Sequence, residues 1–236
     1  MHIKIEAISL PFEKPFTITG ATYTSCDTIR LTVDNGTHQG IGEAIGVDYM
    51  GESIDSIIAQ LEAIQSDLAN GADHESIQTL LPPGGARNAL DCALWDLAAK
   101  REGKRVWDFL GMSVSPVQTV FTIGIDEPET MAAGAAQAKA LPHLKIKLDA
   151  DRPIEKLEAI RAVRPDATFI VDANQGWDIH LLKDILPRLE QLDIALLEQP
   201  LRRGDDEDLR GLETRIPIGA DESLQHIGEF PHIAEI

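Results

Sequence analysis

The chain has 236 residues, of which 43% are hydrophobic and 25% charged, a globular composition that excludes disordered and fibrous classes. Its formal net charge of −18, with no Lys/Arg-rich run, argues against a nucleic-acid partner. The sequence shows no signal-peptide pattern and no long apolar run, so we expect a cytoplasmic protein without membrane contact. Cys26 and Cys92 indicate neither a disulfide framework nor a metal-type cysteine spacing.

Residues 1–115 predict an α+β unit. Strands are expected over 3–10 and 28–33, and Asp34-Asn35-Gly36 predicts a two-residue hairpin turn into a third strand. Apolar residues at helical spacing predict one helix over 53–70, with Ser53 as its N-cap and Gly71 as its stop. A second helix is expected over 86–100.

Residues 116–236 predict alternating strands and helices, which is typical of parallel βα units. The expected strands cover 117–125, 143–148, 168–172, 194–198 and 216–220, and the expected helices cover 128–141, 153–163 and 179–192. Pro187 lies inside the last helix and predicts a kink or a break there. We therefore expect an α/β protein, in which an α+β domain precedes part of a (β/α) barrel.

Four polar residues lie at or near the ends of successive predicted strands: Lys147, Asp172, Glu198 and Asp221. They recur at intervals of about 25 residues, roughly the length of one βα unit with its loops. In a (β/α) barrel the carboxyl ends of the strands meet at one face, where active sites lie. These four side chains are therefore expected to be neighbours in space.

Three clustered carboxylates repel one another unless a cation joins them, and oxygen-only ligands suit Mg²⁺. Asp172, Glu198 and Asp221 are thus the candidate ligands of one magnesium ion per active site. Each acid alone could equally be a helix cap after a strand. Because all three acids lie at or just after the end of an apolar strand, the metal site is favoured over three separate caps.

Lys145 and Lys147 alternate with aliphatic residues, so both ammonium groups are expected on the same side of one strand. Burying two lysines together is costly unless they do chemistry. A lysine that loses its proton in such a site can serve as a general base, and Lys147 is our candidate. The alternative is a solvent-facing edge strand with two surface lysines.

Several segments resemble the muconate lactonizing enzyme subgroup of the enolase superfamily. They are Lys-x-Lys at 145–147, Val-Asp-Ala-Asn-Gln-Gly-Trp at 171–177, Leu-Glu-Gln-Pro-Leu at 197–201, Gly-Ala-Asp-Glu-Ser at 219–223, and, in the first unit, the Gly-Glu-Ala region at 42–44 and the segment 89–100. Segments 44–53 and 122–128 are most similar to those of dipeptide epimerases. The resemblance covers essentially the whole chain.

The resemblance implies a capping domain over 1–115 and a modified TIM barrel that begins at 116. It also implies an isomerase in which a metal held by the three acids grips a substrate carboxylate and stabilises an enediolate. Lys147 would remove the α-proton of the C-terminal residue of a dipeptide, and Lys145 would support it electrostatically. Asn174 and Glu222 would orient the ligands and lysines, and Thr122 would face the substrate.

Two features depart from the pattern that the resemblance implies. Members acting on Ala-Glu hold the glutamate with an arginine in the loop after the first strand, whereas residues 19–25 contain no arginine, so we expect a hydrophobic or other dipeptide. The next strand is expected to end near residue ~245, with a second catalytic lysine, yet the sequence ends at Ile236. We therefore expect a truncated gene product, or part of a longer polypeptide, with a partial barrel.

Alternatives to the epimerase stay open from the sequence. One is a lyase or cycloisomerase of the o-succinylbenzoate synthase or muconate cycloisomerase kind, because these enzymes share the lysines and the metal. Another is an inactive fragment that acts only in assembly or binding. The sequence is also compatible with a homo-oligomer.

Overall fold

The computed structural model describes residues 1–47 and 50–236. Asp48 and Tyr49, which belong to the segment 44–53 used for the resemblance, lie outside the described residues. The chain divides into two compact units, one formed by 1–13 and 24–116 and the other by 14–23 and 117–236. A boundary between a capping domain and a barrel at 115/116 stays a prediction. Among the described residues, no helix combines the length and apolar character needed to span a membrane.

The first unit contains a set of helices and a three-stranded sheet in the order β1-β2-β3, except for the β1–β2 hairpin tip at 14–23, which belongs to the second unit. The strands are β1 (His2–Ile18), β2 (Ala21–Asp34) and β3 (Gln39–Ile45), and the helices are α1 (Ile54–Ala63), α2 (Gln65–Ala69), α3 (Ile77–Leu80), α4 (Gly85–Glu102) and α5 (Val106–Phe109). Strands β1 and β2 are longer than the sequence pattern indicates, because their alternation weakens toward the hairpin tip.

The β2–β3 connection is a hairpin, as predicted, but its loop is longer than two residues. Asp34 pairs with Gln39, so residues 35–38 form the loop. The Asn35 side chain accepts hydrogen bonds from the backbone N–H groups of Thr37 and His38, at 3.0 and 2.9 Å. This side-chain capping stabilises a wider turn than an Asn-Gly pair alone indicates.

The helix expected over 53–70 is divided into α1 and α2 at Ile64, whose φ of −99° and ψ of 10° leave the helical region. The predicted N-cap is confirmed, because Ser53 Oγ accepts a hydrogen bond from Ser56 N at 3.1 Å. The predicted stop also holds, since α2 ends at Ala69, just before Gly71 with its positive φ of 99°.

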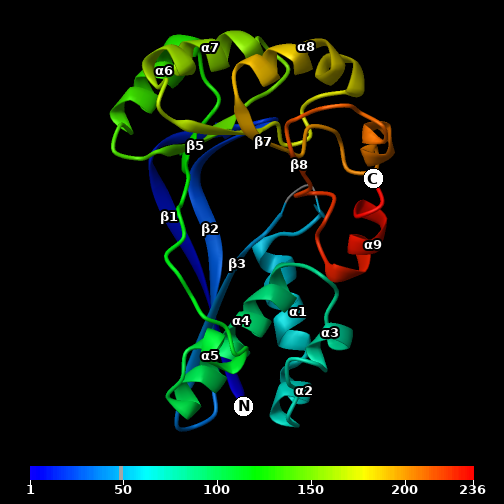
Figure 1. The fold of residues 1–236 in the computed structure, drawn as a ribbon. Coiled ribbons are helices and arrows are strands. Elements are labelled where there is room, and N and C mark those ends of the chain that lie inside the picture. Colours follow the sequence, from blue (N-terminus) through cyan, green and yellow to red (C-terminus); the bar gives the residue numbers. More distant parts are fainter. Residues whose placement is uncertain (48–49) are drawn as a thin grey trace. The chain divides into compact units, whose positions relative to one another are not determined.

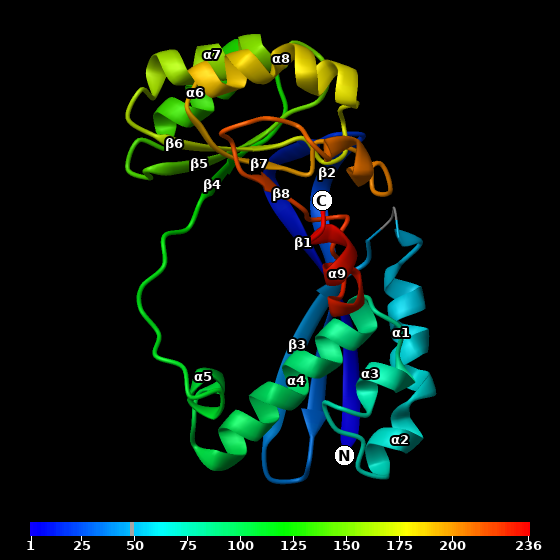
Figure 2. The same ribbon diagram turned by 45° about the vertical axis from the view of Figure 1, so that its right-hand side comes forward.

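Helix α4 packs directly on β3 (Figure 2), and glycines make this approach close enough. A Cβ at Gly42 would lie 1.9 Å from the carbonyl oxygen of Ala89, and one at Gly40 would lie 1.9 Å from that of Ala93. Glycine on the strand and alanine on the helix are therefore required for the backbone contact. This contact anchors the core of the first unit.

The second unit is a parallel five-stranded sheet in the order β4-β5-β6-β7-β8. Its elements are β4 (Phe121–Ile123), α6 (Pro128–Gln137), β5 (His143–Lys147), α7 (Pro153–Val163), β6 (Thr168–Asp172), α8 (Ile179–Gln191), β7 (Ile194–Glu198), the 3₁₀ helix η2 (Asp206–Leu209), β8 (Ile218–Gly219), the 3₁₀ helix η3 (Ile227–Glu229) and α9 (Phe230–Ile233). Helices α6, α7 and α8 cover one face of the sheet (Figure 1).

The helix-facing side of the sheet forms the core of the second unit. Leu144, Ile146, Phe169, Val171 and Leu197 are all fully buried there. Helix α8 runs without a break through Pro187, so of the two predicted outcomes, a kink or a break, the break is excluded. Its apolar face is buried on the sheet, and we attribute the continuity of the helix to that packing, which offsets the hydrogen bond that proline cannot donate.

Candidate active site

The candidate catalytic side chains form one row across the carboxyl ends of the strands. Lys147 pairs with Asp172, Asp172 pairs with Glu198, and Glu198 pairs with Gly219. Because residues in register on parallel strands project to the same side of the sheet, the lysine and the two acids are immediate neighbours. They project away from the apolar face that the helices cover.

A bulge in β7 decides which residue stands beside Asp172. Phe169 pairs with Ile194 but the next residue, Ile170, pairs with Leu196, so Ala195 has no partner on β6. Without this extra residue, Leu197 would be opposite Asp172 and the Glu198 carboxylate would leave the row. The bulge therefore gives the site its second acid.

Both lysines donate to the acids of this row. Lys147 Nζ lies 2.5 Å from Asp172 Oδ2, and Lys145 Nζ lies 2.9 Å from the same oxygen and 2.8 Å from Glu198. The Asp172 side chain is completely buried, whereas those of Lys145 and Lys147 are 21% and 12% exposed. The Lys145 ammonium thus joins the two carboxylates.

These contacts shift the acid–base equilibria in different directions. Burial opposes ionisation of Asp172, but hydrogen bonds from Lys147 and Lys145 outweigh it and lower the pKa of Asp172. Burial likewise opposes the charged form of Lys145, yet its bonds to Glu198 and Asp172 raise the pKa of Lys145. Lys145 is therefore a permanently charged group at neutral pH.

Glu198 behaves differently from Asp172. Its burial raises the pKa of Glu198, and repulsion from Asp172 and Asp221 adds to this, against the hydrogen bond from Lys145. Glu198 is therefore close enough to both Asp172 and Asp221 to be repelled by each of them. Within 1–47 and 50–236, however, no three His, Cys, Asp or Glu side chains are grouped tightly enough to hold a metal ion as they stand.

Asn174 and Glu222 lie around this row. Asn174 Oδ1 accepts a hydrogen bond from Lys147 Nζ at 2.8 Å, and its amide nitrogen donates to Glu222 Oε1 at 3.3 Å. Asn174 has a positive φ of 42°, a conformation that is costly outside glycine and often marks functional sites. Burial raises the pKa of Glu222, and its Oε2 atom is buried with no hydrogen-bond partner among the described residues.

Thr122 and Asp221 flank the row. Thr122 pairs with Lys145 and is half-buried on the same side of the sheet. Asp221 follows β8 and is exposed, and its backbone N–H donates to Gln199 Oε1 at 3.0 Å. All eight candidate residues therefore lie in the second unit, around the ends of β4 to β8.

Sequence reasoning missed several residues that support the site. Thr19 Oγ1 lies 3.1 Å from the carbonyl oxygen of Leu148 and 2.9 Å from that of Ala173, so it ties the β1–β2 hairpin tip to the ends of β5 and β6. Trp177 Nε1 donates to the carbonyl oxygen of Asp149 at 2.9 Å. An isolated threonine in a hairpin carries no sequence signal, whereas Trp177 stands inside the segment 171–177, which carries part of the family resemblance.

The chain was compared with known proteins. Residues 3–111 match the family model of the mandelate racemase/muconate lactonizing enzyme N-terminal domain, and residues 129–236 match that of the enolase C-terminal domain-like family. The chain belongs to the mandelate racemase/muconate lactonizing enzyme family of the enolase superfamily. The resemblance read from the sequence is thereby confirmed, as is the capping sheet followed by part of an enolase-type barrel.

Named relatives of this enolase-superfamily chain are epimerases and racemases. L-Ala-D/L-Glu epimerase of Escherichia coli is 38% identical over 197 residues, which are 82% of this chain and 61% of that protein. The chain thus spans less than two thirds of the length of this relative. A structure of an enolase family member from Agrobacterium tumefaciens, with homology to dipeptide epimerases, has bound sodium and L-Ala-L-Glu; it is 36% identical, with a TM-score of 0.94 over 99% of this chain and 72% of its own.

A third comparison concerns the metal. A dipeptide epimerase from Enterococcus faecalis, solved in complex with Mg and L-Leu-L-Tyr, is 26% identical with a TM-score of 0.91. The match covers 99% of this chain and 71% of the Enterococcus faecalis chain. The arrangement of strands and helices described above is therefore shared with solved structures of dipeptide-binding enzymes.

Proposed function

We propose that this chain carries the proton-abstracting site of a metal-dependent dipeptide epimerase. The observation that carries the proposal is the row of Lys147, Asp172 and Glu198 in register across three parallel strands. This row sets an amine beside carboxylates on the face where active sites of barrel folds lie. The names of the relatives, which are dipeptide epimerases, support the same reaction class.

The residues of the row fit a divalent cation. Asp172, Glu198 and Asp221 supply oxygen ligands only, the kind that Mg²⁺ prefers. The Lys145 ammonium already bridges Asp172 and Glu198, which shows that this pair of carboxylates accommodates a positive charge. We propose that the three acids hold one Mg²⁺, which when bound polarises the substrate carboxylate.

Lys147 is the proposed general base. It takes the proton from the α-carbon, so that the C–H bond breaks, an N–H bond forms at Nζ, and the electron pair moves into the substrate carboxylate. Asn174 Oδ1, 2.8 Å from Nζ, holds the amine in a fixed direction. Lys145 keeps its proton, because its pKa is raised, and its charge opposes the negative charge that develops on the substrate.

The remaining candidates have supporting roles in this proposal. Glu222 fixes the Asn174 amide through the 3.3 Å hydrogen bond and so orients the base indirectly. Thr122 pairs with Lys145 on the neighbouring strand, and this pairing supports a role for Thr122 in contacting the substrate. The experiment below tests the role of Lys147, on which the other assignments depend.

Two observations favour different C-terminal residues in the dipeptide substrate. Relatives named for Ala-Glu, and the neighbour with L-Ala-L-Glu bound, favour a C-terminal glutamate. The lack of arginine in 19–25 favours a C-terminal residue without a carboxylate side chain. A substrate panel should therefore contain L-Ala-L-Glu together with hydrophobic dipeptides such as L-Leu-L-Tyr.

Solvent exchange tests the base directly. In D₂O with Mg²⁺, the chain should incorporate deuterium at the α-carbon of the C-terminal residue, measured by mass spectrometry. Lys147→Ala should slow this exchange by at least about 10²-fold, the usual contribution of a general base, while Mg²⁺ binding is retained. Lys183→Ala, which changes an exposed lysine of α8, is the matched control.

Two results would contradict the proposal. Exchange at the wild-type rate in the Lys147→Ala variant would refute the base assignment. No exchange with any dipeptide of the panel, although Mg²⁺ binds, would refute the epimerase function itself.

A further inference from the structure

Gln199 links the ends of β7 and β8 directly beside the candidate metal ligands. It follows Glu198 in the chain and is only 2% exposed. Its backbone has a positive φ of 34°, a strained conformation for a residue other than glycine. A buried polar residue kept in a strained conformation next to a reactive carboxylate calls for a structural or functional reason.

The Gln199 amide is fully engaged. Its Oε1 accepts hydrogen bonds from the backbone N–H groups of Asp221 and Ser223, both at 3.0 Å. Its Nε2 donates to the Leu201 carbonyl oxygen and to Ser223 Oγ, each at 2.9 Å, and lies 3.3 Å from Asp206 Oδ1. Oxygen faces two N–H groups and nitrogen faces a carbonyl, so only one orientation of the amide satisfies these partners.

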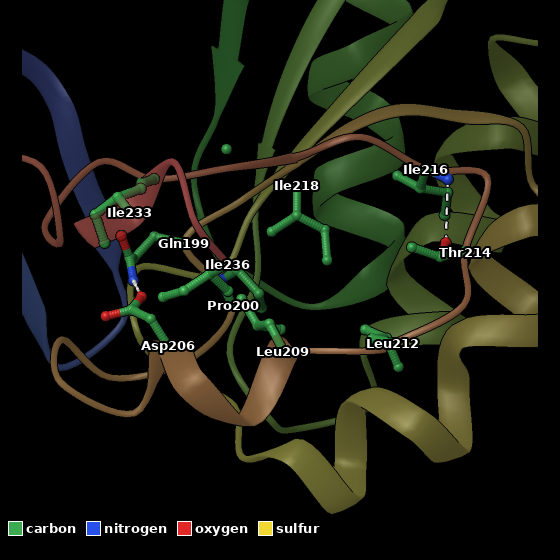
Figure 3. Close-up of a pocket in the computed structure, with 12 residues that line it drawn as sticks. Gln199, Pro200, Asp206, Leu209, Leu212, Thr214, Ile216, Ile218, Ile233 and Ile236 are labelled. Carbon is green, nitrogen blue, oxygen red and sulfur yellow. Dashed lines mark hydrogen bonds between the residues drawn. The ribbon is translucent and has the colours of Figure 1, made fainter. Parts of the chain in front are cut away.

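Asp206 and Ser223 hold the Gln199 amide in place from the other side. Figure 3 shows the contact between Gln199 and Asp206 at the wall of a pocket. Asp206 accepts the Ser223 hydroxyl at 2.7 and 2.8 Å, which directs the lone pairs of that hydroxyl toward Gln199 Nε2. Gln199, Asp206 and Ser223 are all buried, so this network exchanges little with water.

The strand ladder does not reach Asp221. Strand β8 contains only Ile218 and Gly219, and the bond from Gln199 N to the Gly219 carbonyl oxygen, at 2.8 Å, is formed beyond the last pair of the ladder. Asp221 lies two residues further on. Beyond this point the chain after β8 is bonded to the end of β7 by the Gln199 side chain instead of by backbone pairs.

We propose that Gln199 is a positioning residue that sets the place of Asp221 relative to Glu198. We call the two hydrogen bonds from the Asp221 and Ser223 N–H groups to Gln199 Oε1 the clamp. Because Gln199 directly follows Glu198, the clamp fixes the turn after β8 relative to the end of β7. The consequence for metal binding rests on the proposed function, whereas the clamp itself does not.

Hydrogen exchange in the metal-free chain tests the clamp. Gln199→Met keeps a side chain of similar length but removes both the acceptor and the donor. The amides of Asp221 and Ser223 should then exchange about tenfold faster, as expected when one buried hydrogen bond is lost. Gln191→Met, which changes an exposed residue of α8, should leave them at the wild-type rate.

Two further variants separate the clamp from a general effect on folding. Gln199→Glu in its protonated form keeps a carbonyl oxygen toward both N–H groups and a hydroxyl toward the Leu201 carbonyl oxygen, and the nearby Asp206 favours that neutral form, so protection should return to within about threefold of wild type. Ser223→Ala removes the hydroxyl but keeps the backbone N–H, so the Asp221 amide should stay protected. If Gln199→Met does not fold, an unprotected Asp221 amide in Gln199→Glu overturns the proposal.

Mn²⁺ titration tests the consequence for the ligands. Gln199→Met should bind Mn²⁺ about tenfold more weakly than Gln191→Met, the size of effect typical for residues that orient metal ligands. Equal Mn²⁺ affinity in the two variants, or wild-type exchange in Gln199→Met, overturns the positioning role. If the wild-type chain binds no Mn²⁺, the proposed metal-dependent function fails, and hydrogen exchange alone decides whether Gln199 holds the turn.

Discussion

Replacing Lys145 with methionine would remove the cation that joins Asp172 to Glu198. Methionine matches the length and apolar stem of lysine, so the substitution changes charge more than packing. Asp172 would keep its bond from Lys147, whereas Glu198 would lose the only ammonium that the described contacts give it. The two carboxylates would then repel each other in the metal-free protein.

The magnitude follows from the burial of the three groups. Breaking a fully buried ion pair costs about 3–5 kcal/mol. Lys145 and Glu198 are 21% and 17% exposed, and Asp172 retains Lys147, so we expect a smaller loss of about 2 kcal/mol. For a chain of this size, that loss lowers the melting temperature by about 4–8 °C.

Added Mg²⁺ should offset most of this loss. The Lys145 ammonium lies 2.9 Å from an Asp172 oxygen and 2.8 Å from a Glu198 oxygen, two of the proposed metal ligands, so it opposes a divalent cation there. Its removal should tighten Mg²⁺ binding at least tenfold, which adds about 1.4 kcal/mol of stabilisation at saturating metal. The variant should therefore gain about 3–6 °C more from Mg²⁺ than the wild type does.

Differential scanning calorimetry with and without Mg²⁺ measures both effects, and it resolves separate transitions if the two units unfold independently. Lys183→Met on α8 is the matched control and should behave as wild type. An equal Mg²⁺-induced shift in Lys145→Met and wild type would show that Lys145 does not compete for the metal ligands. The reasoning about this site would then be wrong.

Three sets of substitutions test the surroundings of the site and the core of the first unit. Thr19→Val should cost about 1 kcal/mol in unfolding free energy and raise the rate of hydrogen exchange over 14–23, whereas Thr19→Ser should stay close to wild type. Equal unfolding free energies and equal exchange rates in the two variants would exclude a role for the hydroxyl. Asp149→Asn should cost more in denaturant unfolding, about 2 kcal/mol, than Lys156→Met at about 1 kcal/mol. The Lys156 side chain is 3% exposed and would keep only Asp151, at 3.8 Å, as a charged partner after losing Asp149 at 2.7 Å, whereas Asp149 is 35% exposed; the reverse order would contradict this. Gly42→Ala should destabilise the first unit by about 3 kcal/mol or more, because its Cβ would lie 1.9 Å from the Ala89 carbonyl oxygen, and a melting temperature equal to wild type would show that α4 moves away at little cost.

Local sequence patterns were enough to place many elements of the second unit. The strand over 168–172, the strand over 194–198 and the helix over 153–163 have the bounds that the sequence predicted. The alternation of Lys145 and Lys147 with Leu144, Ile146 and Leu148 likewise set which side chains share a face. These features depend on neighbours within a few residues, so the sequence alone determined them.

Register and contact between distant segments were decided only by the tertiary structure. The unpaired Ala195, which brings Glu198 instead of Leu197 beside Asp172, is a property of two strands together and leaves no mark in either one. The contacts of Thr19 with Leu148 and Ala173 join residues more than a hundred positions apart. The bond between Gln199 and the turn of Asp221 likewise depends on how β7 and β8 pair, because a side chain can clamp a distant backbone only after the sheet has brought the two together.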